Sequence, residues 1–159
     1  MMKKKHPKDV LQMLQNARIP KTAQRRAVLE LLLTATRPLS AMAIVQKLKA
    51  RSRVDKVTVY RILSLFRARG MIREIPSSDG TLYFEMAMSN NPQHPHFNCR
   101  ICGSFTCLEP ASITQEHPAL SIPDNFRVDN IQINISGLCA TCLGTQKAKP
   151  VKWTYKKRG

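Results

Sequence analysis

The fold is decided first by residues 55–70, which read DKVTVYRILSLFRARG. Apolar side chains recur there at intervals of three and four, the spacing that places them on one face of a helix: Val59, Ile62, Leu63 and Phe66. Asp55 stands where an N-terminal capping residue belongs, and Gly70 stands where a left-handed residue ends a helix. The stretch therefore predicts an amphipathic helix from Asp55 to Arg69.

Three further helices are expected on the N-terminal side of this stretch. The first covers residues 8–16. Thr22 can cap the second, whose apolar face is expected to contain Val28, Leu31 and Leu32. Because proline cannot continue a helix, the pair Arg37-Pro38 ends it. Ser40 can cap the third helix, whose apolar positions are Ala41, Ile44, Val45 and Leu48.

A hairpin is expected after the last helix. Residues 71–75 and 82–86 flank the turn-forming segment Ser77-Ser78-Asp79-Gly80. Three helices followed by a two-stranded wing are typical of a winged helix-turn-helix, in which one helix enters the major groove of DNA. The pattern alone leaves a second interpretation open, a generic small helical domain with a trailing hairpin.

The charge balance indicates a polyanionic partner. The 159 residues include 26 Lys and Arg against 10 Asp and Glu, a formal net charge of +16. Such an excess favours nucleic acid, because basic side chains displace the counterions of phosphates. No apolar run reaches the roughly 20 residues that span a bilayer, and no apolar segment follows the basic start. We therefore expect a cytoplasmic protein whose five cysteines are reduced.

The composition changes at residues 89–95, where Asn, Pro, Gln and His interrupt the helical pattern. Beyond this segment we expect short strands and one weak helix near residues 112–117. Polar residues alternate with Ile131, Ile133 and Ile135, which predicts a strand with one buried face. The predicted organisation is a winged-helix domain at 1–88, a hinge at 89–95, a cysteine-rich domain at 96–146 and a basic tail at 147–159.

Two cysteine pairs share one spacing, Cys99-x-x-Cys102 and Cys139-x-x-Cys142. Such a turn points two sulfurs at one metal, and two turns complete the tetrahedral shell of four thiolates that suits zinc. Gly103 fits this interpretation, because a glycine after the turn can adopt a positive φ. We predict a structural zinc site, with redox-active thiols and an iron–sulfur cluster as the alternatives.

Several motifs, taken in order along the chain, resemble the ferric uptake regulator superfamily. Thr58-Val59-Tyr60-Arg61 is similar to its recognition-helix signature, and residues 94–103, His-Pro-His-Phe-Asn-Cys-Arg-Ile-Cys-Gly, are similar to its His-x-His-x-x-Cys-x-x-Cys-Gly segment. Phe84-Glu85 resembles the aromatic–acid pair at its hinge. The segment from Gly137 to Cys142 most resembles the zinc uptake regulators. The match extends from about Lys8 to Leu143.

The resemblance implies an α+β chain, in which an N-terminal winged helix-turn-helix precedes a small α/β dimerisation and metal-binding domain at 96–146 with a four-cysteine zinc site. It also implies a homodimer that binds an AT-rich palindromic operator when loaded with metal and represses transcription.

This chain differs from the pattern that the resemblance implies for the family's regulatory metal site. A histidine just before the third helix is replaced by Pro38, a histidine in the last β segment by Ile131, and an acidic ligand by Cys107. The donors that remain are Glu85, His94, His96 and Cys107. Such a set suits four-coordinate zinc, because a thiolate disfavours iron and manganese. Alternatively, the histidines are solvated linker residues and Cys107 is a small core residue.

The face of the fourth helix opposite its apolar stripe is expected to meet the major groove. Arg61 would contact a phosphate or a guanine there, and Tyr60 a thymine methyl or a phosphate. The alternative for any such face is simple solvation. The candidate DNA-binding residues are Lys21, Arg25, Lys56, Thr58, Tyr60, Arg61 and Ser64.

The leading hypothesis is a metal-responsive, zinc-dependent transcriptional repressor with one structural and one regulatory zinc. The alternatives are an iron- or peroxide-responsive regulator of the same family and a zinc-ribbon nucleic-acid-binding module without metal sensing. An RNA-binding module would need stacking platforms, yet aromatic residues make up only 6%. An enzyme is not expected, because a closed four-thiolate site offers no position for a substrate. The expected partners are double-stranded DNA and a second copy of the chain, with no membrane and no small-molecule substrate.

Overall fold

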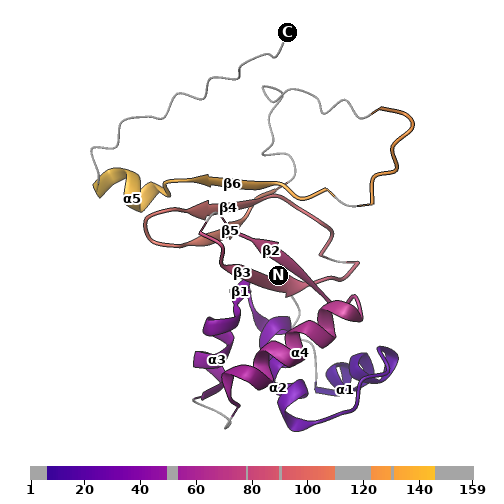
Figure 1. Cartoon of the computed structure of the whole chain (residues 1–159). Coiled ribbons are helices and arrows are strands. Elements are labelled where there is room, and N and C mark those ends of the chain that lie inside the picture. Colours follow the sequence, from indigo (N-terminus) through magenta and orange to yellow (C-terminus); the bar gives the residue numbers. More distant parts are fainter. Residues whose placement is uncertain are drawn as a thin grey trace.

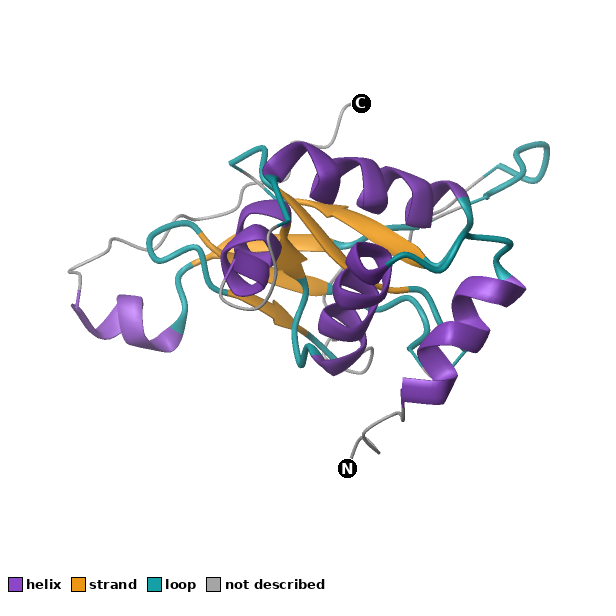
Figure 2. Cartoon of the chain, turned by 90° about the horizontal axis from the view of Figure 1, so that it is seen from below, coloured by secondary structure: helices purple, strands orange, loops and turns teal. Residues whose placement is uncertain are grey.

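The computed structural model describes residues 7–49, 54–77, 79–89, 91–109, 123–129 and 131–145. Four helices, α1 (Pro7–Asn16), α2 (Ala23–Thr34), α3 (Ala41–Lys49) and α4 (Lys56–Ala68), form a layer on one side of the strands (Figure 1). Seen from the helical side, the helices lie in front of the strands (Figure 2). The helix expected at 112–117 and the tail at 147–159 lie outside the described residues.

Side-chain caps begin three of these helices, as the sequence predicts. Thr22, Ser40 and Asp55 each accept a hydrogen bond from the backbone N–H three residues further on, at 3.3, 3.2 and 2.9 Å. Each cap satisfies one of the N–H groups that a helix N-terminus leaves without an intrahelical partner. At the other end of α4, Gly70 adopts φ +64°, the left-handed conformation expected there.

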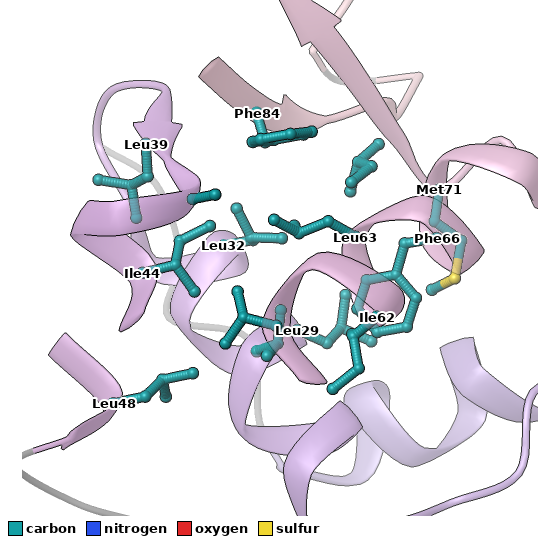
Figure 3. Close-up of a cluster of buried hydrophobic side chains, with 14 of the residues drawn as sticks. Leu29, Leu32, Leu39, Ile44, Leu48, Ile62, Leu63, Phe66, Met71 and Phe84 are labelled. Carbon is teal, nitrogen blue, oxygen red and sulfur yellow. The ribbon is translucent and has the colours of Figure 1, made fainter. Parts of the chain in front are cut away.

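The hydrophobic core lies between the helices and the first sheet (Figure 3). All the predicted apolar positions of α3 and α4 are buried. The predicted face of α2 needs a correction, because Leu29 is fully buried and Leu31 is only half-buried. Since α2 packs against α1 as well as against α3 and α4, its buried face turns toward Leu29.

The first sheet is the wing. It contains β1 (Leu39–Ser40), β2 (Ile72–Pro76) and β3 (Leu82–Met86), all antiparallel, in the order β1-β3-β2. The first strand of the hairpin, β2, begins one residue after its predicted start, and the second strand, β3, has its predicted bounds. The register of the hairpin pairs Arg73 with Glu85 across the two strands. Helices α2 to α4 with this sheet confirm the winged helix-turn-helix.

The second sheet contains β4 (His96–Cys99), β5 (Phe105–Cys107) and β6 (Asn134–Gly137) in the order β5-β4-β6, with α5 (Ala140–Thr145) after β6 (Figure 1). β4 is antiparallel to β5 and parallel to β6. The prediction of a strand with one buried face at Ile131–Ile135 is wrong, because the strand starts at Asn134, and Ile131 and Ile135 are 49% and 37% exposed. An alternating pattern of apolar and polar residues identifies an apolar face, but it does not show what covers that face. Here the described residues of the chain leave Ile131 and Ile135 exposed.

The wing packs directly against the second sheet. The ring of Tyr83 on β3 stacks on the ring of Phe105 on β5, with centroids 4.3 Å apart. The Tyr83 hydroxyl donates a hydrogen bond to the carbonyl oxygen of Gly103 at 3.3 Å, and the Gln132 side chain donates one to the carbonyl oxygen of Glu74 at 3.0 Å. In the described part of the chain, no helix is long and apolar enough to cross a membrane.

Candidate metal centres and DNA-binding surface

The four paired cysteines converge at the end of the second sheet. Their sulfur atoms all lie within 4.8 Å of one another, and those of Cys102 and Cys139 are 3.7 Å apart. Zinc–sulfur bonds of about 2.3 Å in a tetrahedron place the sulfurs roughly 3.8 Å apart, so the spacing fits one zinc ion. Cys99 ends β4, and Cys142 lies in α5. Gly103 adopts φ +66°, as the turn after the first pair requires.

Backbone N–H groups prepare this cluster for a cation. Hydrogen bonds from the N–H groups of Cys102 and Cys139 lower the pKa of Cys99 to about 6, so its sulfur is largely a thiolate at neutral pH. The hydrogen bond with Ser104 lowers the pKa of Cys102. By contrast, burial raises the pKa of Cys142 to about 12. A bound cation would supply the positive charge that Cys142 needs to lose its proton.

A second cluster forms where the wing, the predicted hinge at 89–95 and the second sheet meet. It consists of Glu85 on β3, His94 in the hinge, His96 on β4 and Cys107 on β5, and their donor atoms lie within 4.8 Å of one another. Oε2 of Glu85 is 3.5 Å from Nε2 of His94 and 3.6 Å from Nε2 of His96. Of the three positions where the resemblance implies a replaced ligand, Cys107 belongs to this cluster, whereas Pro38 and Ile131 do not.

The Nε2 atoms of both histidines face Glu85 in this cluster. Nδ1 of His94 lies 2.9 Å from the carbonyl oxygen of Pro92, which can only accept a hydrogen bond. In the neutral ring Nδ1 therefore carries the proton and Nε2 carries the lone pair that a metal binds. Nε2 of both His94 and His96 is buried without a hydrogen-bond partner. A metal ion would satisfy both nitrogens, so the donors fit the group that the family implies.

The charges around the second cluster favour an ionised Glu85. Burial acts to raise the pKa of Glu85, but the nearby ring of His96, the positive charge that His94 carries when it is protonated and the charge of Arg73 outweigh it, and the pKa is lowered. Partial burial of its thiol and the negative charge of Glu85 raise the pKa of Cys107. Cys107 therefore needs a bound cation to become a thiolate at neutral pH.

The candidate DNA-binding residues lie on the helical layer. Those of α4 are exposed except Thr58, which is half-buried and whose hydroxyl donates a 2.6 Å hydrogen bond to the capping carboxylate of Asp55. The exposed set on α4 is Lys56, Tyr60, Arg61 and Ser64. The ammonium of Lys56 lies 5.8 Å from the centroid of the Tyr60 ring. Lys21 is exposed, and half-buried Arg25 donates to the carbonyl oxygen of Pro20 at 3.0 Å.

Sequence analysis missed Arg73, which borders the second cluster. Its Nε donates to Oε1 of Glu85 at 3.1 Å. A signal was present, because Arg73 and Glu85 stand six residues before and six residues after Asp79, at the centre of the predicted turn. Opposite charges at equal distances from a hairpin turn are candidates for a cross-strand pair.

Comparison with known proteins agrees with this geometry. The ferric uptake regulator family profile matches residues 16–136. The chain is 26% identical over 136 residues to the peroxide operon regulator of Bacillus subtilis (strain 168), across 85% of this chain and 92% of that protein. It is 30% identical over 133 residues to the ferric uptake regulation protein of Legionella pneumophila, across 82% of this chain and 96% of that protein.

A solved structure shows the same fold. The ferric uptake regulator of Vibrio cholerae matches 80% of this chain and 98% of its own length, with a TM-score of 0.67 and 25% identity. The profile match covers most of the chain and includes the winged helix and all of the second cluster. The chain therefore belongs to the ferric uptake regulator family of metal-responsive transcription regulators.

Proposed function

We propose that this protein is a zinc-dependent transcriptional repressor that binds palindromic DNA as a homodimer and has no enzymatic activity. One observation carries the proposal. Donor atoms from the wing, the hinge and the second sheet converge in one cluster, so an ion held there ties the DNA-binding unit to the rest of the chain. The four-cysteine cluster would hold a separate, structural zinc.

Zinc is favoured as the sensed ion by the chemistry of the donors. Cys107 contributes a soft sulfur to two imidazoles and one carboxylate, a set that suits four-coordinate zinc better than iron or manganese. The resemblance of the segment from Gly137 to Cys142 to the zinc uptake regulators favours the same ion. The second candidate is an iron- or peroxide-responsive regulator, which is supported by the names of the relatives from Legionella pneumophila and Bacillus subtilis.

Metal would act on DNA binding through the angle between the two units. Glu85 belongs to the wing, and His96 and Cys107 belong to the second sheet, so a shared ion fixes one orientation of the wing. A dimer that reads two half-sites needs a fixed spacing between its recognition helices. An ion that binds the competent orientation more tightly raises the apparent DNA affinity by shifting the population toward it.

The homodimer is supported by apolar side chains that the described part of the chain leaves exposed on β6, on α5 and in the residues 123–129 and 131–133 that precede β6 in sequence. Phe126 is 64% exposed, and β6 is an edge strand of its sheet. Exposed apolar side chains and the edge of a sheet are both surfaces that a second chain can cover. The exposed apolar residues of this region are Phe126, Val128, Ile131, Ile135 and Leu143.

A zinc titration of DNA binding tests the proposal. The duplex is selected from a random palindromic library, and the protein holds zinc in its four-cysteine site at the start. For the wild-type chain we expect zinc to raise affinity about 5- to 150-fold, the usual range of allosteric coupling. His96→Ala and Cys107→Ser should abolish the increase and keep the affinity measured in chelator.

Cys107→Asp is the matched variant that separates zinc from iron. It keeps a negatively charged donor but replaces sulfur by oxygen, so the preference should move toward iron and manganese. If the wild-type chain and all three variants bind the duplex equally in chelator and in excess zinc, the second cluster does not sense zinc.

A further inference from the structure

Arg73 on β2 contacts the second cluster from the wing side. Nε and Nη2 of its guanidinium both lie 3.1 Å from the same carboxylate oxygen of Glu85, Oε1. The side chains are 20% and 8% exposed, so water screens the pair weakly. Nε donates a hydrogen bond to Oε1 and Nη2 forms an ion pair with the same oxygen, while the other oxygen, Oε2, faces His94 and His96.

The same guanidinium holds the hinge backbone before His94. Nη2 lies 2.5, 3.3 and 3.4 Å from three carbonyl oxygens, those of Asn91, Met86 and Pro92. The carbonyl oxygen of Pro92 also accepts the hydrogen bond from Nδ1 of His94. Arg73 therefore reaches two of the four donors of the cluster, Glu85 directly and His94 through Pro92.

We infer that Arg73 is the positioning residue of the second cluster, restricting Glu85 to one ligand oxygen and joining the cluster to the wing and the hinge. The inference rests on the proposed function, because it needs a metal ion at the cluster. Without the guanidinium, Oε1 of Glu85 is free to bind the ion as a second oxygen. A four-coordinate site would then become five-coordinate, and Glu85 and His94 would lose the group that orients them, which weakens binding.

A lysine cannot reproduce this arrangement. The planar guanidinium offers several N–H donors in a fixed geometry, whereas an ammonium is a point charge on a flexible stem. Arg73→Lys therefore keeps the charge beside Glu85 but not the simultaneous contacts to the carboxylate and the hinge carbonyls. A purely structural ion pair between the strands would behave differently, because its loss would lower stability and leave the coordination of the metal unchanged.

Cobalt(II) is the probe that separates these two roles, since its visible absorption is strong in four-coordinate tetrahedral sites and weak in five-coordinate ones. The full-length chain, with zinc in its four-cysteine site, is titrated with Co²⁺ as wild type, Arg73→Lys, Arg73→Gln and His96→Ala. Arg67→Gln is the matched control, because Arg67 also pairs with a wing carboxylate, that of Glu74, outside the cluster. Thermal unfolding of each variant reports on folding.

We expect both Arg73 variants to bind Co²⁺ roughly 10- to 100-fold more weakly, the usual effect of losing a residue that orients a ligand. Their visible bands should weaken, while Arg67→Gln keeps the wild-type affinity and spectrum. If both Arg73 variants match the wild type and His96→Ala loses the cobalt, Arg73 is only a structural ion pair and the proposed metal site stands. If the wild-type chain takes no cobalt at the second cluster, the proposed function and this inference both fail.

Discussion

At the scale of single residues, Cys99 is the cysteine whose replacement best tests the four-cysteine site. It is fully buried at the end of β4 and receives a hydrogen bond from the N–H of Cys139 at 3.4 Å. We predict that Cys99→Ser releases the structural zinc and unfolds the second sheet, because the binding energy of such a zinc is folding energy, about 10–16 kcal/mol. Metal content and thermal unfolding measure the effect.

The control for this prediction uses the other metal cluster. Cys107→Ser removes a sulfur from the second cluster only, and should keep one zinc per chain. When Cys99→Ser is added to Cys107→Ser, the second cluster no longer contributes zinc, so the measured zinc content reports on the four-cysteine site alone. A double variant that still holds one zinc tightly, with unchanged thermal stability, would show that the four cysteines are not the structural site.

Arg61 is the residue whose replacement separates two kinds of DNA contact. It is exposed on α4, beside Tyr60. If Arg61 reads a base, Arg61→Ala should cost about 1–3 kcal/mol on the selected duplex and relax specificity at one position. If it binds a phosphate, affinity should fall on all sequences. The slope of log affinity against log salt concentration should then decrease by about one, the value expected for one phosphate contact. Fluorescence anisotropy at several salt concentrations distinguishes these outcomes, and an unchanged affinity contradicts both.

At the scale of the elements, α4 carries a pH-dependent cap. The hydrogen bonds from the side chain and the backbone N–H of Thr58 lower the pKa of Asp55 from its usual 3.8. A carboxyl group with a lowered pKa in the folded state contributes stability that is complete above 3.8 and is lost as the pH falls through the folded value. We predict that Asp55→Ser, which keeps a neutral cap, removes this part of the acid sensitivity, whereas Asp55→Ala lowers stability at neutral pH.

Thermal unfolding between neutral pH and pH 2 measures both effects. The difference in stability between wild type and Asp55→Ser should shrink as the pH falls below 3.8. A constant difference over the whole range would mean that the charge of Asp55 does not contribute to the cap.

At the scale of the whole molecule, the uncovered face of β6 predicts the oligomeric state. Ile135→Lys places a charge at the exposed isoleucine of β6, so it should convert the proposed dimer into monomers in light scattering at micromolar concentration. Leu82→Lys is the matched control, because Leu82 is a similarly exposed strand residue of the wing, 42% against 37%. Equal dimer fractions in the two variants would place the interface elsewhere.

The sequence predicted best what is decided by neighbouring residues. The caps at Thr22, Ser40 and Asp55 depend on hydrogen bonds that span three residues, so local chemistry determines them. The four cysteines were also predictable, since their paired spacing encodes the geometry of a metal site.

What depends on distant segments was less accessible. The contact between Arg73 and Glu85 follows from the register of the hairpin, and the burial of Leu29 follows from how α2 packs on α1. The convergence of the second cluster was proposed from the family pattern and not from any local spacing. Its formation needs the path of the hinge, which brings His94 beside Glu85.

The parallel pairing of β4 with β6 has a consequence for how the chain refolds. The partners Cys99 and Gly137 are separated by a long stretch of chain, so their ladder forms late and slowly. The four cysteines lie at the end of this ladder. A metal ion bound by them would therefore close the loop between Cys99 and Gly137 before the strands pair. When zinc is removed during refolding, the winged helix should form first while β4, central in the finished sheet, remains an open edge. Such an edge recruits strands from other chains, so zinc starvation during synthesis should produce aggregates as well as apo-protein.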